Sequence, residues 1–123
     1  MIKPSEAVSQ PALSFKNDEE SCFYTLVMSN PDGHFTDDNA EYLHWMVGNI
    51  PCDGSFGTEE TDIARLGENI CPYLQPFPPY GTGFHRFVFI LYKHVSKRPS
   101  NYELFGTICR FLGCYVNIEY CLT

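Results

Sequence analysis

The chain has 123 residues, of which 44% are hydrophobic and 15% aromatic, and its formal net charge is −7 at pH 7. This length allows one domain at most, and the apolar content predicts a folded core rather than disorder. The negative charge argues against a nucleic-acid binder with a broad basic face, because Lys and Arg supply most of such affinity. No window reaches the roughly 18 apolar residues that a membrane span needs, which predicts no membrane insertion.

The first part of the chain, residues 1–21, mixes Pro, Ser, Gln and charged residues without periodicity. This composition predicts a flexible N-terminal segment, with the ordered core over residues 22–95 and a divergent tail over 96–123. The segment lacks the apolar centre of a secretory signal, and it is too acidic and too poor in Arg for a mitochondrial presequence. We therefore expect any import signal to be absent or to lie upstream of Met1.

Two strands are predicted early in the core. Residues 22–29 form a continuous run of apolar, aromatic and β-branched side chains that ends at the turn sequence NPDG, as a strand entering a turn does. Residues 44–50 predict a second strand, which Pro51 is expected to close. The acidic stretch 59–68 has too few apolar positions for a helix and is expected to be a surface insertion.

The second half of the chain begins with prolines at positions 72, 76, 78 and 79. They remove backbone donors and predict a stiff, extended loop rather than a sheet strand. Residues 87–92 are apolar without polar alternation, which is typical of a strand buried on both faces. Residues 101–123 fit one or two strands or a poor helix, and the sequence leaves this open. The basic cluster formed by Lys93, His94, Lys97 and Arg98 is expected to be a solvated loop, the alternative being a contact to phosphate or to an acidic partner.

Six cysteines stand at positions 22, 52, 71, 109, 114 and 121. They form no C-x-x-C pair and have no histidines at zinc-site spacing, so we expect no metal site. Reduced and mostly buried thiols, with no disulfide, are the prediction. The sequence also lacks a G-x-S-x-G elbow, a P-loop and an H-E-x-x-H motif, so we expect no enzyme activity, no catalytic residue and no cofactor.

Two histidines, His44 and His85, stand at the boundaries of β-rich apolar runs. Either one alone is more simply a half-buried histidine bonded to the backbone. Together with the N–H-rich turn at residues 81–83 and a proline wall, they predict a pocket for a small phosphate or carboxylate without a metal. Arg86 is expected to form a structural ion pair, and Asp32 either orients a histidine or caps the turn.

The segments 41–51 and 78–89, each with one of these histidines, resemble the paired signatures of the phosphatidylethanolamine-binding protein family. The resemblance spans residues 23–93. It implies a mainly β fold: a partial β-sandwich with a large antiparallel sheet that lacks some N- and C-terminal elements of the family, as in a fragment or splice variant. It also implies one small anion pocket, formed by Asn30, Asp32, His44, Pro79, Gly81, His85 and Phe87.

This pocket departs from the family pattern at two places. The first turn has Asn30-Pro31-Asp32 followed by Gly, where ligand-binding members carry Asp-Pro-Asp-x-Pro, and Phe87 stands where many of them have tyrosine. Both changes remove polar groups and predict a weakened or vestigial pocket.

The proline-aromatic loop 72–78 and the segment 81–86 resemble one branch of the family, found in the large subunit of the mitochondrial ribosome. The resemblance to this branch implies a non-catalytic structural role in the mitochondrial matrix, with large-subunit rRNA and ribosomal proteins as partners. The alternative is a free module that binds phospholipid headgroups or phosphorylated ligands in the anion pocket.

Overall fold

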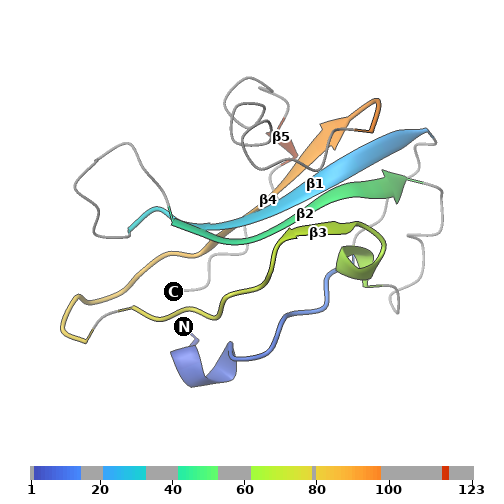
Figure 1. Cartoon of the computed structure of the whole chain (residues 1–123). Helices are drawn as coiled ribbons and strands as arrows, with labels where there is room; N and C mark the ends of the chain where they lie inside the picture. The colour runs from blue at the N-terminus through green and yellow to red at the C-terminus, as the bar shows by residue number, and fades with distance from the viewer. Residues whose placement is uncertain are drawn as a thin grey trace.

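The strands of this protein form one antiparallel sheet (Figure 1). The computed structural model describes residues 2–14, 21–32, 42–52, 62–78, 80–97 and 115–116. Its elements, in chain order, are η1 (Pro4–Glu6), β1 (Cys22–Asn30), β2 (Tyr42–Cys52), η3 (Ile63–Arg65), β3 (Glu68–Cys71), β4 (Val88–His94) and β5 (Tyr115–Val116). The strand order is β3-β2-β1-β4-β5. No helix in these ranges is long and apolar enough to cross a membrane.

Strand β1 lies at the centre of the sheet, paired with β2 on one side and β4 on the other. Eight of its nine residues are buried, and its side chains join apolar clusters on both faces of the sheet, which explains why its sequence is a largely apolar run rather than an alternating one. The predicted strands at 22–29 and 87–92 are therefore confirmed as β1 and β4, with shifts of a residue or two at their ends.

Strand β2 is longer than predicted and contains a β-bulge. Tyr24 pairs with Ile50 but Leu26 pairs with Val47, so one residue of β1 faces two of β2 there. Asn49 accommodates the extra residue with a φ of 52°, a conformation that asparagine tolerates. The expectation that Pro51 closes the strand is wrong, because Pro51 pairs with Phe23 of β1. Proline is tolerated there because the described pairing with β3 covers only residues 46–48 of β2.

The main core lies on one face of the sheet. It is formed by apolar side chains that alternate along the strands, among them Tyr24, Leu26, Met28, Trp45, Val47, Ile50, Phe87, Phe89 and Leu91. Leu13 and Tyr73 pack against this cluster from outside the sheet. In the described ranges, the second layer over this face is thus built from irregular segments. A smaller cluster around Val27, Met46 and Tyr92 occupies the other face.

The segment that follows residue 61 is not the surface insertion that the acidic stretch predicted. Ile63 and Ala64 of η3 are buried, and the Asp62 side chain caps η3 by accepting the backbone N–H of Ala64. Strand β3 follows at once. A Cβ on Gly67 would lie 2.6 Å from the Val47 side chain, so only glycine lets this turn pack against β2. Of the proline-rich loop, residues 72–78 are described and form no strand, as predicted.

The N-terminal residues make specific contacts within the segment 1–21 that was expected to be flexible. The Tyr73 hydroxyl donates to the carbonyl of Ala7 at 2.7 Å. The backbone N–H of Ile63 donates to the carbonyl of Leu13 at 2.8 Å. Residues 2–14 are therefore fastened to the segments that carry Ile63 and Tyr73, beside which they run in Figure 1. The division of the chain at 21 and 95 stays a prediction.

The prediction that the chain has no disulfide is wrong, because Cys22 and Cys52 are bonded. They are cross-strand partners at the shared end of β1 and β2, and their Cα atoms are 5.0 Å apart, within the usual range for disulfides. The pairing register, which spacing along the chain does not give, brings them together. Cys71 is free, and the other cysteines lie outside the described residues.

Candidate functional site

His85 is the centre of the candidate site and lies just before β4. Only 5% of its surface is exposed. Its Nδ1 lies 3.4 Å from the side-chain nitrogen of Asn30, and its Nε2 lies 2.8 Å from the hydroxyl of Thr82. The ring is thus held between Asn30 at the end of β1 and Thr82 in the turn just before His85. A buried imidazole with both nitrogens in polar contacts is fixed in orientation.

Asp32 and Arg86 tie the two segments together beside His85. Asp32 accepts the backbone N–H of Arg86 at 2.7 Å and forms an ion pair with its guanidinium at 2.8 Å. The side-chain and backbone hydrogen bonds from Arg86 lower the pKa of Asp32 to about 2. The prediction of a structural ion pair for Arg86 is confirmed. Among the described residues, the Asp32 carboxylate bonds to Arg86 and caps no turn, and it is the Asn30 side chain that accepts the N–H of Asp32.

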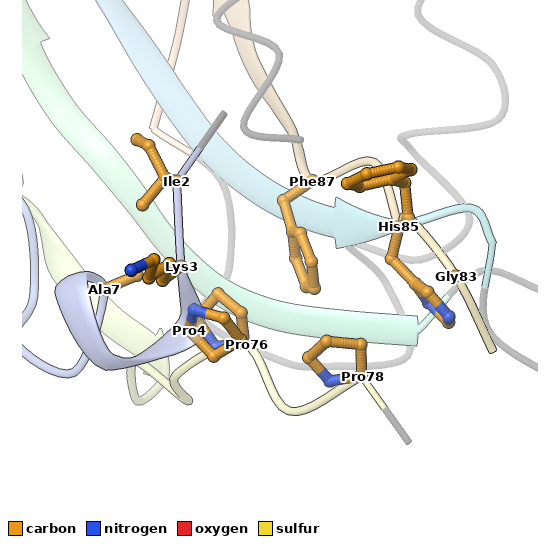
Figure 2. A pocket seen from close by; sticks show the side chains of 10 residues that line it. Ile2, Lys3, Pro4, Ala7, Pro76, Pro78, Gly83, His85 and Phe87 are labelled. Carbon is orange, nitrogen blue, oxygen red and sulfur yellow. The ribbon is translucent and has the colours of Figure 1, made fainter. Parts of the chain in front are cut away.

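A cavity of about 260 Å³ opens beside His85. Its walls come from the N-terminal segment, the proline-rich loop and the residues before β4: Ile2, Lys3, Pro4, Ala7, Pro76, Pro78, Gly83, Phe84, His85 and Phe87. Figure 2 shows Ile2 and Pro4 on one side of the cavity and Phe87 and His85 on the other. Pro76 and Pro78 lie below them in this view. Most of these walls are apolar, so polar recognition is concentrated at His85 and Lys3.

His44, the other predicted pocket histidine, is buried beside the cavity but does not line it. It is 1% exposed, and its Nδ1 donates to the carbonyl of Leu74 at 2.9 Å. Burial lowers the pKa of His44, and the bond to Leu74 opposes this shift. Its ring packs edge-on against Phe87, with centroids 5.1 Å apart. Of the two histidines, only His85 lines the cavity.

The other predicted pocket residues divide into four groups. Phe87 lines the cavity, while Asn30 and Asp32 act behind His85 through the contacts described above. Gly81 lies in the turn with a φ of 82° but is not part of the wall, whereas Gly83, with a φ of 80°, is. Pro79 lies outside the described residues.

Sequence reasoning missed the wall that the N-terminal segment contributes. Nothing local in residues 2–7 signals a binding surface, and their position depends on Tyr73, which follows Ala7 by 66 residues.

His94 was also misjudged as part of a solvated cluster. It is buried, bonded to Thr25 and the carbonyl of Ser96, and stacked on Phe23. Among the residues that the structure describes, no three His, Cys, Asp or Glu side chains gather as a metal site would require.

Comparison with known proteins places these features in context. The family model described as phosphatidylethanolamine-binding protein matches residues 3–111. Protein BROTHER of FT and TFL 1 from Arabidopsis thaliana is 35% identical over 113 residues, which are 86% of this chain and 58% of that protein. Protein TERMINAL FLOWER 1 from the same plant is 36% identical over 97 residues, covering 77% and 49%. The chain thus spans about half the length of these curated relatives.

The fold has a counterpart among solved structures. The phosphatidylethanolamine-binding protein from Plasmodium vivax matches with a TM-score of 0.52 and 28% sequence identity, over 75% of this chain and 48% of that one. Together with the large antiparallel sheet, this likeness confirms the predicted fold class, mainly β and only part of a larger sandwich.

Proposed function

Because this chain belongs to the phosphatidylethanolamine-binding protein family, we propose that its cavity at His85 binds a small anionic group in a non-catalytic role. A phospholipid headgroup or a phosphorylated ligand would carry that group. The observation that supports this most is the buried His85 ring in the wall of a mostly apolar cavity. Such a combination of apolar walls and a few fixed polar groups is typical of small-molecule sites.

The size and lining of the cavity narrow the class of ligand. At about 260 Å³ it lies just below the usual range for drug-sized ligands, so it suits one small group rather than a whole lipid. Its walls of Ile2, Pro4, Pro76 and Phe87 favour an anion that carries an apolar substituent over a bare ion. Lys3, also in the wall, supplies positive charge.

The non-catalytic role rests on the sequence and on the relatives. The chain carries none of the nucleophile or metal motifs sought above, and the names of the two plant relatives refer to no reaction. We therefore assign the site to binding alone.

Titration of the full chain with inorganic phosphate, phosphoethanolamine and phenyl phosphate tests this proposal. We expect the imidazole NMR signals of His85 to shift, with the tightest binding for phenyl phosphate. His85→Gln should weaken binding at least about tenfold, the effect of losing one hydrogen bond to a charged group. His94→Gln is the matched control, because His94 is a buried histidine at the far end of β4. Unchanged His85 signals with all three compounds would exclude the proposal.

A structural role in the mitochondrial large ribosomal subunit stays a prediction, together with its rRNA and protein partners and its matrix location. None of the relatives reported above is named as a ribosomal protein, so the comparisons give this role no support. Co-sedimentation of the chain with large subunits would be its direct test.

A further inference from the structure

We propose that Asn30 is a positioning residue that fixes His85 in the Nε2–H tautomer. The Nε2–H bonds to Thr82 in the free protein, and a ligand oxygen that takes the place of the Thr82 hydroxyl would accept it. A neutral imidazole carries its proton on one nitrogen only, and the partner of the other nitrogen decides which. The statement about the ring concerns the protein alone; the statement about the ligand rests on the function proposed above.

The orientation of the Asn30 amide is set by the backbone of Asp32. The N–H of Asp32 lies 3.0 Å from Oδ1 of Asn30. Because a backbone N–H can only donate, the atom facing it must be the amide oxygen rather than the nitrogen. The amide nitrogen of Asn30 is thereby turned toward His85.

The amide nitrogen in turn sets the tautomer of His85. It is only a donor, and it lies 3.4 Å from Nδ1, a long contact that requires Nδ1 to accept. In the neutral ring the proton is then on Nε2, which donates to the Thr82 hydroxyl at 2.8 Å. A chain of hydrogen bonds thus runs from Asp32 through Asn30 and His85 to Thr82, and each residue donates to the next.

Two other buried histidines have the opposite arrangement and provide internal references. Nδ1 of His44 lies 2.9 Å from the carbonyl of Leu74, and Nδ1 of His94 lies 2.8 Å from the carbonyl of Ser96. A carbonyl oxygen only accepts, so both rings carry a proton on Nδ1. His85 therefore differs from both because its Nδ1 partner is an amide donor.

The tautomer decides which groups the site can accept. Phosphate and carboxylate oxygens without protons are acceptors only, so one that replaces the Thr82 hydroxyl would accept the Nε2–H of His85. A carboxylate at position 30 would instead accept a hydrogen bond from Nδ1–H, and the neutral ring would then have its lone pair on Nε2, facing Thr82. Asn30 thus selects for ligands that accept hydrogen bonds, such as phosphate oxygens, over ligands that donate them.

Long-range ¹H–¹⁵N correlation spectra of the full chain test this inference without any ligand. The spectra should be recorded at a pH high enough for all three rings to be neutral. We expect a protonated Nε2 in His85 and a protonated Nδ1 in His44 and His94. Asn30→Asp should move the His85 proton to Nδ1. Asn69→Asp, which adds the same charge at an exposed position on β3, should leave all three patterns unchanged.

The outcomes separate this inference from the proposed function. A wild-type His85 with its proton on Nδ1 would overturn the inference, as would an Asn30→Asp protein that keeps the Nε2–H pattern. If Asn30→Asp does not fold, the wild-type spectrum alone decides whether the inference holds. The expected tautomer combined with unchanged His85 signals on adding phosphate would support the role of Asn30 and reject the anion site.

Discussion

Asp32 and Arg86, which are 54 positions apart, are joined through both backbone and side chain. One carboxylate oxygen of Asp32 accepts the Arg86 backbone N–H at 2.7 Å, and the other lies 2.8 Å from the guanidinium. The contact holds the residues before β4 against the turn that follows β1. It therefore supports the position of His85, the neighbour of Arg86, although neither charged residue lines the cavity.

Replacing the Asp32 carboxylate tests the strength of this link. We expect Asp32→Asn to lower the free energy of unfolding by about 1 kcal/mol, a modest value because the Arg86 side chain is 59% exposed. Since the folded pKa of about 2 lies below the ordinary 3.8, the contribution is complete above that ordinary value and is lost as the pH falls toward 2. Urea unfolding of both proteins across this range should show their stabilities converge in acid.

The matched control for Asp32 is Glu68→Gln, which removes the same charge from an exposed position on β3. It should leave stability within about 0.5 kcal/mol of the wild type, as surface substitutions usually do. An Asp32→Asn protein as stable as this control at neutral pH would show that the ion pair contributes nothing.

His44 makes the stability of the fold depend on pH near neutrality. Burial lowers its pKa below the ordinary 6.5, so the folded state binds fewer protons than the unfolded state. Its contribution is therefore complete above pH 6.5 and declines as the pH falls below that value. Glutamine at position 44 can still donate to Leu74 but does not titrate. As the pH falls from about one unit above 6.5 to about one unit below, we therefore expect the free energy of unfolding to decrease less in His44→Gln than in the wild type. Equal losses in denaturant unfolding would contradict the assignment.

The bond between Cys22 and Cys52 should stabilise the sheet. Removing both thiols in a Cys22→Ala, Cys52→Ala protein should lower the free energy of unfolding by about 3 kcal/mol, because the bond closes a loop with a sequence separation of 30. Cys71→Ala, at the free and partly exposed thiol, serves as the control. Alkylation of the unfolded, unreduced chain followed by peptide mass analysis should leave Cys22 and Cys52 unmodified. Their alkylation under these conditions would rule the bond out.

We expect the hydrogen bond from the Tyr73 hydroxyl to Ala7 to hold the N-terminal wall of the cavity in place. Tyr73→Phe removes the donor to Ala7 but keeps the ring that packs edge-on against Trp45. We expect a loss of about 1 kcal/mol in the free energy of unfolding and faster amide hydrogen exchange at Glu6 and Ala7. Tyr80→Phe removes the same atom from a fully exposed side chain and should change neither. Unaltered exchange in the Tyr73 variant would mean that other contacts hold the segment.

The parts of the fold that the sequence predicted are those whose pattern is local. Strands β1 and β4 are mostly apolar because most of their side chains are buried, and that run is visible without a structure. Strand β3 has only four residues, two of them exposed, and it exists because β2 offers it an edge. Its sequence alone has no strand signal.

The site divides in the same way. His85 and Phe87 were predicted because they stand inside a segment that resembles a known signature. The wall made by residues 2–7 and the bond between Cys22 and Cys52 depend on contacts between distant parts of the chain, set by one hydroxyl and by one strand register. His44 kept its predicted place near the site but faces Leu74 and Phe87 instead of the cavity, because its strand turns it into the core.

The place of Ile2 in the cavity wall has a practical consequence for anyone who purifies this protein. A histidine tag or fusion partner attached at the start of the chain would begin one residue from the proposed binding site. Its imidazoles or carboxylates would then compete with added compounds and distort measured affinities. Samples for such titrations should have the tag cleaved off, leaving no foreign residues ahead of Met1.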